Sequence, residues 1–340
     1  MPLKLVTLIL AGAIVVVAVF VLSRAAMKND FGLPRNRDAK RETISISGRE
    51  KEIMVTEGTK HSIPLAQIVG GGPPKDGIPS IDRPKFISVS EAAALLLDTE
   101  PGLAFEHKGV SRFYPFQILV WHEIVNDTIG GQRVLVTYCP LCLSGIVFDP
   151  TVQGERVEFG TSGKLWNSNL LMYDRKTNSL WSQILGEAVV GEMTGMRLPV
   201  LPSDQIRFGE WRKLHPDAQV LSRDTGRTRL YGQDPYGDYY TTPGTYFPVS
   251  KKDDRLAEKD FVLGIVVNGK AKAYSPAAVK NAGVVADVFQ GKTIVAVYEK
   301  DIDAVRIFEK KSNGALVRIN PFGSFWFSWV AAHPDTELFK

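Results

Sequence analysis

Short apolar runs separated by turn-forming residues dominate the chain beyond about residue 100. Runs of this length, punctuated by Gly, Pro, Asn and Asp, predict β-strands. They cover residues 111–114, 134–138, 146–149, 156–159, 170–173, 261–267 and 293–298. Residues 88–97 predict a short helix, because a Ser that can cap it precedes Glu91 and an Ala/Leu run. The pattern therefore predicts a mainly β (α+β) fold with few short helices.

The N-terminal pattern is different and predicts one membrane-spanning helix. Residues 5–22 are apolar apart from Thr7, with Lys4 before them and Arg24 after them. As a helix this run would be about 27 Å long, close to the hydrocarbon thickness of a bilayer. A cleavable signal is the alternative, but residues 23–25 form a weak cleavage site. We expect an uncleaved anchor, with the rest of the chain extracytoplasmic, in the periplasm or at the cell surface.

The chain beyond the anchor repeats itself. Residues 109–138 align with residues 269–298 at an offset of 160, and the Trp-x-x-x-His-Pro-Asp motif at 211–217 recurs at 329–335. Two related β-rich units from an internal duplication explain this pattern. We expect an anchor or signal segment at 1–27, a tether at 28–60, a first unit at 61–255 and a smaller second unit at 256–340. His215 and His333 recur in both units, so we expect them to pack near helix ends.

The charge pattern excludes one class of partner. The chain has 340 residues and a net charge of +4, from 41 basic and 37 acidic residues. Lys and Arg are scattered among Asp and Glu and do not form a stripe with aromatic residues, so we expect no nucleic-acid partner.

The only two cysteines, Cys139 and Cys142, lie in the turn Cys-Pro-Leu-Cys between two strand-like runs. Gly130-Gly131 predicts a two-residue hairpin turn just before them. That turn pairs Ile129 with Gln132, and continuing the register places His122 opposite Cys139. Directly opposed side chains have Cβ atoms about 4.5 to 5.5 Å apart. Cys139, Cys142 and His122 are therefore candidate ligands of an open copper or zinc site.

Two other interpretations of the cysteines stay open. They could form a redox-active dithiol or disulfide, or a structural disulfide or inert thiols. The repeat bears on this, because the second unit has Ala282, Glu299 and Ile302 where the first has the imidazole and the two thiols. The fold therefore does not require the three side chains. Glu123 is a candidate general base or a partner that orients the imidazole, and the alternative is a solvated strand charge.

The first unit is longer than the second by about 42 residues, the difference between the offsets of 160 and 118. The extra segment is dense in Asn, Ser, Trp and Tyr and contains two probable hairpins. Its aromatic and polar residues could line a substrate pocket or could serve the turns of a small sheet. The candidates are Trp166, Asn167, Asn169, Tyr173, Asp174, Trp181, Ser182 and Gln183.

Long motifs of the chain are similar to those of a prokaryotic family, the domain of unknown function 3179. They include WHEIVNDTIGGQRVLVTYCPLCLSGIVFD, EWRKLHPDAQVLSRDTG and YGQDPYGDYY. The resemblance covers most of the chain from about Gly70 onward, and it implies an exported or membrane-anchored protein without an established reaction. The family pattern is Cys-Pro-Leu-Cys-Gly-Ser, and Leu143 here replaces the Gly, the residue expected to permit a positive φ.

The sequence thus predicts a membrane-anchored extracytoplasmic protein with a soft-metal site at the Cys-Pro-Leu-Cys turn, which could be catalytic with Glu123 moving protons. The alternatives are a thiol–disulfide oxidoreductase and a non-enzymatic binding or scaffold module. The expected partners are the membrane, through the N-terminal helix, and a metal or small molecule.

Overall fold

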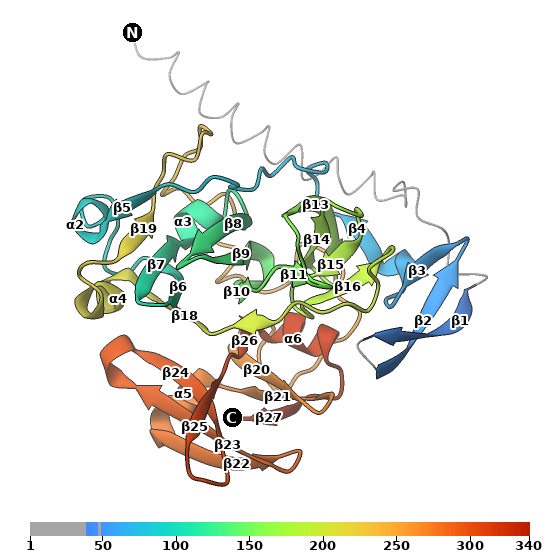
Figure 1. Cartoon of the computed structure of the whole chain (residues 1–340). Coiled ribbons are helices and arrows are strands. Elements are labelled where there is room, and N and C mark those ends of the chain that lie inside the picture. Colours follow the sequence, from blue (N-terminus) through green and yellow to red (C-terminus); the bar gives the residue numbers. More distant parts are fainter. Residues whose placement is uncertain (1–38, 47–48) are drawn as a thin grey trace.

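The structure is a computed structural model that describes residues 39–46 and 49–340. The predicted anchor lies outside the described residues. In the described part, no helix combines the length and the apolar character that crossing a membrane requires. Strands form several sheets and the helices are short, so the prediction of a mainly β protein is confirmed (Figure 1). We call residues 61–255 the first unit and residues 256–340 the second unit.

The first unit is built around two sheets. One has the strand order β18-β6-β7-β19-β5 and the other β17-β10-β9-β8. Its elements are β5 (Phe86–Ser88), α2 (Val89–Ala92), β6 (Pro101–His107), β7 (Val110–Pro115), α3 (Phe116–Leu119), β8 (Ile124–Ile129), β9 (Gln132–Cys139), η3 (Pro140–Cys142), β10 (Ser144–Phe148), β17 (Val200–Leu201), β18 (Ser203–Arg207), α4 (Phe208–Leu214) and β19 (Gln219–Leu221). The predicted helix at 88–97 is shorter than expected, but Ser88 and Glu91 do form its capping box.

The second unit runs through the same order of elements. They are β20 (Phe261–Val267), β21 (Lys270–Tyr274), α5 (Pro276–Ala282), β22 (Val284–Phe289), β23 (Lys292–Glu299), η4 (Lys300–Ile302), β24 (Ala304–Lys310), β25 (Leu316–Ile319), β26 (Phe322–Phe325), α6 (Trp326–Ala332) and β27 (Glu337–Phe339). Its sheets have the orders β26-β20-β21-β27 and β22-β23-β24-β25. In each unit the last strand pairs in parallel, β19 with β7 and β27 with β21.

The repeated motifs take the same places in both units. Asp127 of β8 holds Arg112 and Tyr114, and Asp287 of β22 holds Lys272 and Tyr274. These side chains tie the two sheets of each unit together.

The repeated histidines also take equivalent places. His215 and His333 stand at the C-caps of α4 and α6, and the ring of each packs against the Trp four residues before it. The prediction that they pack at helix ends is confirmed.

An eight-stranded sheet contains the extra segment of the first unit. Its order is β1-β2-β3-β16-β15-β14-β13-β4. The strands are β1 (Lys40–Ile46), β2 (Arg49–Thr56), β3 (Thr59–His61), β4 (Ile68–Gly70), β13 (Phe159–Trp166), β14 (Asn169–Asp174), β15 (Leu180–Ser182) and β16 (Glu187–Val190). A short 3-10 turn, η2 (Leu65–Gln67), precedes β4, and β11 (Thr151–Val152) pairs with β12 (Glu155–Arg156). The described part of the predicted tether therefore forms strands, and the charged residues of β1 suit its position at the edge of this sheet.

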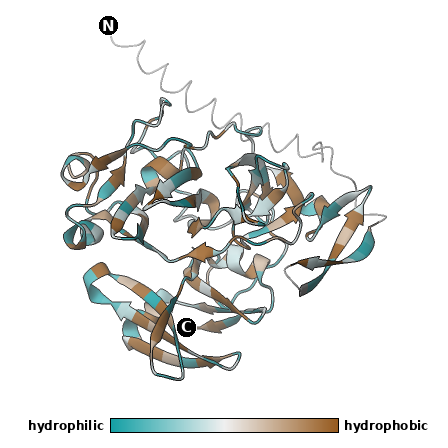
Figure 2. Cartoon of the chain, viewed as in Figure 1, coloured by the Kyte–Doolittle hydropathy of each residue, from teal (hydrophilic) through white to brown (hydrophobic). Residues whose placement is uncertain are grey.

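Strand β9 is apolar on both faces because both faces are covered. Leu135 and Cys139 point to the core shared with the eight-stranded sheet, whereas Val134, Val136 and Tyr138 point to the core under α3. Hydrophobic strands accordingly line the interior in Figure 2. The alternation along the strand places Cys139 on the side of the extra segment.

No extra segment covers the equivalent sheet of the second unit. There, Val284 and Val288 on β22 are 59% and 74% exposed. In the first unit Ile124 occupies the place of Val284 and is buried. The larger first unit thus encloses a strand end that the second unit leaves open.

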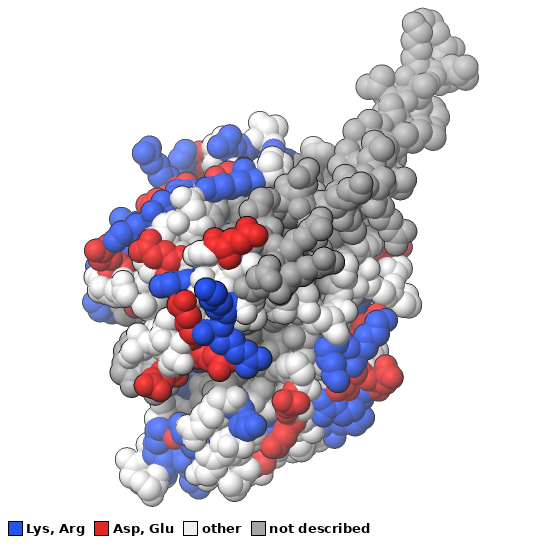
Figure 3. Space-filling view, turned by 90° about the vertical axis from the view of Figure 1, so that its right-hand side faces the viewer, with Lys and Arg blue, Asp and Glu red and all other residues white. Residues whose placement is uncertain are grey.

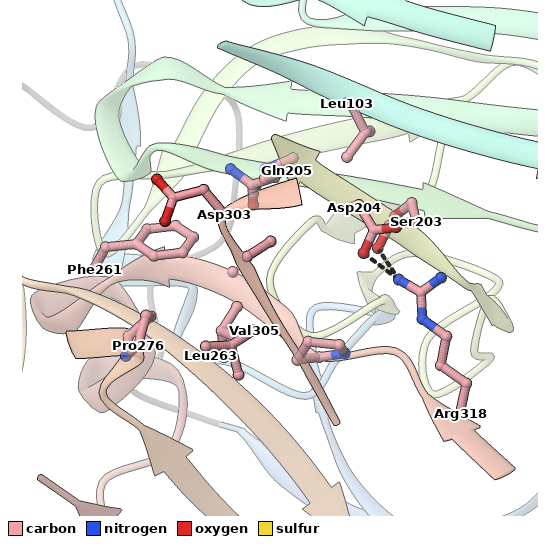
Figure 4. A pocket seen from close by; sticks show the side chains of 14 residues that line it. Leu103, Ser203, Asp204, Gln205, Phe261, Leu263, Pro276, Asp303, Val305 and Arg318 are labelled. Atoms are coloured by element: carbon pink, nitrogen blue, oxygen red, sulfur yellow. Dashed lines mark hydrogen bonds and ion pairs between the residues drawn. The ribbon is translucent and has the colours of Figure 1, made fainter. Parts of the chain in front are cut away.

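The two units contact each other between β10 and β26 and between β18 and β24. A cavity of about 230 Å³ lies between them, and Figure 4 shows Asp204 and Arg318 paired directly with each other in its wall. Asp204 also pairs with Arg306 at 2.7 Å, so one carboxylate serves two guanidinium groups at this contact. On the face of the molecule that Figure 3 shows, basic and acidic side chains are interspersed.

Candidate functional site

The Cys-Pro-Leu-Cys turn has a backbone that the fold itself imposes. Cys139 ends β9, residues 140–142 form the 3-10 turn η3, and Leu143 follows at φ 49°. The second unit repeats this turn at residues 300–302, with Asp303 at φ 45°. A positive φ is therefore needed after the turn, and Leu143 adopts it without being Gly. The thiols are the feature that distinguishes the first turn.

Both thiols are buried and face one point. Cys139 and Cys142 are free cysteines with 1% and 0% of their surface exposed. Their Sγ atoms lie 3.9 and 3.3 Å from the same carbonyl oxygen, that of Ser168 in the turn between β13 and β14. The extra segment of the first unit therefore supplies the group on which the two sulfurs converge.

Asn169 points a fixed donor at one sulfur. Its Nδ2 donates to Cys142 Sγ at 3.4 Å and to Gln183 Oε1 at 3.1 Å, while its Oδ1 accepts from the backbone N–H of Ile184 at 3.1 Å. A backbone N–H can only donate, so the amide cannot be turned around. Gln183 in turn donates to the carbonyl of Ser144 at 3.0 Å and is locked. The network holds an N–H permanently against Cys142.

The two thiols have pKa values shifted in opposite directions. Burial raises the pKa of Cys139 well above its usual range, and its hydrogen bond to Cys142 adds to the rise. Burial also acts to raise the pKa of Cys142, but hydrogen bonds from Cys139, Ser328 and Asn169 outweigh it and leave that pKa lowered. The hydrogen bonds therefore stabilise a negative charge on Cys142 more than one on Cys139.

Ser328 is a site residue that the sequence did not reveal. It lies on α6 of the second unit, and among the described residues its buried hydroxyl has the sulfur of Cys142 as its one partner. Phe325 and Phe327 beside it belong to the same core as the two cysteines. The only signal in the sequence is a Ser inside an apolar aromatic helix. The second unit, which lacks thiols of its own, thus completes the surroundings of those in the first.

An aromatic loop covers the turn from the other side. This loop carries the tyrosine-rich stretch at residues 231–240. Tyr239 is fully buried, and its hydroxyl donates to the carbonyl of Leu141 at 2.9 Å. Lys259 stacks over the Tyr239 ring, with Nζ 3.6 Å from the ring centre. The loop therefore closes over the thiols and excludes water.

His122 is not placed as the hairpin register predicted. The pairing of Ile129 with Gln132 is confirmed, and the register holds as far as Ile124. Before that point the chain turns, because the N–H groups of His122 and Glu123 both bond to the carbonyl of Leu119. The pairing of His122 with Cys139 is therefore wrong, because β8 ends before it reaches that position.

The His122 ring is held by other groups. Nδ1 lies 2.7 Å from the carbonyl of Pro79, and Nε2 lies 2.7 Å from the Tyr231 hydroxyl. Burial lowers its pKa, and the charges of Arg229 and Arg227 lower it further. In the described part of the chain, no group of three or more His, Cys, Asp and Glu side chains is arranged to hold a metal ion.

Glu123 is buried in a strained backbone conformation. Its φ is 58°, and the equivalent residue of the second unit is Gly283, with φ 75°. The fold needs a positive φ here, and Gly is the residue that adopts it without strain. Burial raises the pKa of Glu123 to about 8. Its charge also acts on both cysteines and on Tyr236, so the carboxyl lies close to the thiols.

A cavity of about 410 Å³ opens beside Glu123 and above the turn. Its wall includes Leu141 of the turn and Leu170, whose N–H bonds to Cys139. Most of the remaining wall is apolar, from prolines 73 and 74 and from Val120, Leu165 and Phe247.

None of the eight residues predicted to form a pocket wall lines this cavity. Their polar groups serve internal contacts instead: Trp166 Nε1 donates to Gln67, Trp181 Nε1 to Asp174, and the Tyr173 hydroxyl to Asp76. Asn167 accepts from the N–H of Ser250, and Ser182 is fully buried. Only Asn169 touches a thiol directly, with Gln183 behind it. Leu165 and Leu170, which stand next to Trp166 and Asn169 in β13 and β14, line the cavity instead, because alternate residues of a strand point to opposite faces.

Comparison with known proteins identifies one family. The family described as "Protein of unknown function (DUF3179)" matches residues 75–336, which cover both units and the thiol turn. No curated protein and no solved structure matches the chain.

Proposed function

The chain belongs to the DUF3179 family of proteins of unknown function, and on the geometry of its thiol turn we propose that it binds one copper(I) ion between Cys139 and Cys142. One observation carries the proposal: both sulfurs converge on the same carbonyl oxygen, that of Ser168. A cation between the sulfurs would meet three electron-rich atoms. Thiolates are soft ligands, and soft ligands select copper(I).

Of the two metals that the sequence suggested, copper(I) fits the site better than zinc. Structural zinc is almost always held by four protein ligands, and catalytic zinc by three. His122, the expected third ligand, has both ring nitrogens engaged. Charge also favours a monovalent ion. Copper(I) held by two thiolates carries one net negative charge, which the donors of Asn169 and Ser328 at Cys142 would stabilise.

Anaerobic titration of the reduced full-length chain with copper(I), against a chromogenic copper(I) chelator, tests the proposal. We expect about one tightly bound ion per chain, and sulfur ligands without imidazole in X-ray absorption. Cys139→Ser and Cys142→Ser should each abolish tight binding. Cys139→Ala and Cys142→Ala serve as second variants, with near-ultraviolet circular dichroism to establish that each is folded.

His122→Ala is the control that distinguishes a site with two sulfur ligands, as the structure indicates, from the three-ligand site that the hairpin register predicted. It should keep its copper, because His122 is not a ligand here, although it should lose stability. Tight copper binding that survives both cysteine substitutions would refute the proposal. Loss of copper from folded His122→Ala would also contradict it and would restore the three-ligand site.

A thiol–disulfide oxidoreductase is the second candidate, favoured by the opposite pKa directions of the two thiols. The Cys142 thiolate would attack a substrate disulfide, forming a mixed disulfide and releasing one substrate thiol. Cys139, after losing its proton to Glu123, would attack Cys142 Sγ and release the second thiol. Two electrons pass from the protein to the substrate. A Cys139→Ser variant that traps no mixed disulfide with a small-molecule disulfide would count against this function.

We also propose that the body of the protein lies outside the cytoplasm, anchored by residues 5–22, and that the two units arose by duplication. The location is supported by the apolar run, and the duplication by the matching element order and sheet pairing. An alkaline phosphatase fused after Lys340 should be active, since this enzyme folds only in an oxidising compartment. An inactive, stably expressed fusion would contradict the location.

A further inference from the structure

We propose that the 410 Å³ cavity lined by Glu123 and Arg229 binds a small organic carboxylate with an apolar body. The cavity lies within the size range of small-molecule sites, which are mostly apolar with a few convergent polar groups. This site goes beyond the copper proposal and does not require the metal.

The backbone at Glu123 supports a retained role for its side chain. Gly283 shows that the same fold position accepts a residue without a side chain. A non-Gly residue at positive φ is uncommon, and the left-handed region costs about 1 to 2 kcal/mol for L-residues. Burying a carboxyl group adds a further free-energy cost to that of the backbone. In the described part of the chain, no residue gives the Glu123 carboxyl a hydrogen bond. The group is thus held beside the cavity without a partner of its own.

The charges of the wall determine the sign of the ligand. Glu123, Lys164 and Arg229 are its charged side chains. Arg229 and Lys164 are half-buried, and burial together with the charge of Lys75 lowers the pKa of Lys164. The wall carries two cations and one carboxyl, so its formal charge is net positive in either protonation state of Glu123. These cations attract an anionic group, and a protonated Glu123 can donate a hydrogen bond to it.

The rest of the wall determines the body of the ligand. Segments from separate parts of the chain meet here, among them the Gly/Pro-rich stretch at 71–78, the turn at 120–123, strand β13 and the loop near Tyr236. Their contributions are mainly Pro, Ile, Val, Leu and Phe side chains. An aliphatic or aromatic body would bury apolar surface against them, at about 25 cal/mol for each Å² removed from water.

Isothermal titration calorimetry of the full-length chain with octanoate, octanol and octylamine tests both features. The three probes share one apolar body and differ in charge. Octanoate should bind at least about tenfold more tightly than octylamine, with octanol between them, because a like charge in a desolvated site is strongly disfavoured. Equal or tighter binding of octylamine would overturn the proposal, as would the absence of octanoate binding at millimolar concentration.

Four variants locate the site. Ile78→Trp fills the cavity from its half-buried wall position and should abolish octanoate binding, and Arg229→Ala should weaken it about fivefold to tenfold. Arg227→Ala, an exposed neighbour outside the wall, is the matched control and should leave binding unchanged.

The double variant Cys139→Ser/Cys142→Ser should still bind octanoate, so failure of the copper proposal can be told apart from failure of this one. Unchanged octanoate binding by folded Ile78→Trp would place the ligand elsewhere and refute the assignment.

Discussion

Replacing Glu123 with Gln should stabilise the protein at pH 8 while changing its stability little near pH 4.5. Burial raises the pKa of this carboxyl from 4.5 to about 8. Below the lower value the folded and unfolded states both hold the proton. Between the two values only the folded state holds it, so unfolding releases a proton and is favoured as the pH rises. The wild-type protein therefore loses stability through this window, whereas a Gln side chain does not titrate.

The two pKa values set the size of the effect. Their difference of about 3.5 corresponds to about 5 kcal/mol, at about 1.4 kcal/mol for each pH unit. This is the upper limit, reached at pH 8 and above, because the unfolded chain has already ionised and the folded state must bury the charge. At pH 6 the expected gain is about 2 kcal/mol. Gln keeps the size of the side chain and the positive φ, so the comparison isolates the charge.

Denaturant unfolding followed by Trp fluorescence, at pH values from about 4.5 to about 8.5, measures the difference. Glu192→Gln, at an exposed position, is the matched control and should show no pH-dependent gain. A stability difference between Glu123→Gln and wild type that is constant across this range would refute the reasoning. So would a difference that falls with pH, which would mean that the ionised carboxyl is stabilised by a partner.

Three further outcomes are expected. Asn169→Ala removes a fixed donor from Cys142 and should raise the pKa of that thiol by about one to two pH units, since a hydrogen bond to a charged group contributes about 1.5 to 3 kcal/mol. The ultraviolet absorbance of the thiolate measures this pKa, and an unchanged titration would show that Asn169 does not act on Cys142. Asp127→Asn leaves Arg112 buried without its charged partner and should lower the stability of the protein by about 3 to 5 kcal/mol. Asp287→Asn should lower it less, because the pair in the second unit is less buried. Equal losses of stability in thermal unfolding would contradict this ranking. His122→Ala should destabilise the protein by about 2 to 4 kcal/mol, because the buried hydrogen bonds to Pro79 and Tyr231 are lost. A variant as stable as the wild type would show that these hydrogen bonds make no net contribution to stability.

The local pattern of the sequence was enough to predict the strands and the hairpin turn. Gly130 and Gly131 both have positive φ, as a two-residue hairpin requires, and the pairs from Ile129 to Val125 follow from that turn. These features depend on neighbouring residues alone. The register failed at His122 because its backbone bends after α3, and the left-handed residue Glu123 is not recognisable from its type.

The internal repeat gave information that local patterns cannot give. It separated residues that the fold needs, such as Asp127 and Asp287, from those that it does not, such as Cys139 and Cys142. It also shows why Glu123 is unusual, since Gly283 fills the same place in the second unit. The repeat could not show that Ser328 of the second unit reaches Cys142, because that contact joins residues distant in the chain.

The sequence by itself determined the mainly β character, the repeated order of elements and the position of the two thiols in a turn. Those properties follow from residue types at short spacing. Only the tertiary structure decided which atoms surround the sulfurs: the Ser168 carbonyl, the Asn169 amide and the Ser328 hydroxyl, in place of the imidazole of His122. It also decided that the cavity lies beside Glu123 and away from the predicted aromatic wall. Such neighbours come from separate strands and from both units. They are brought together by the packing of the sheets against one another, and no short-range pattern of the sequence encodes that packing.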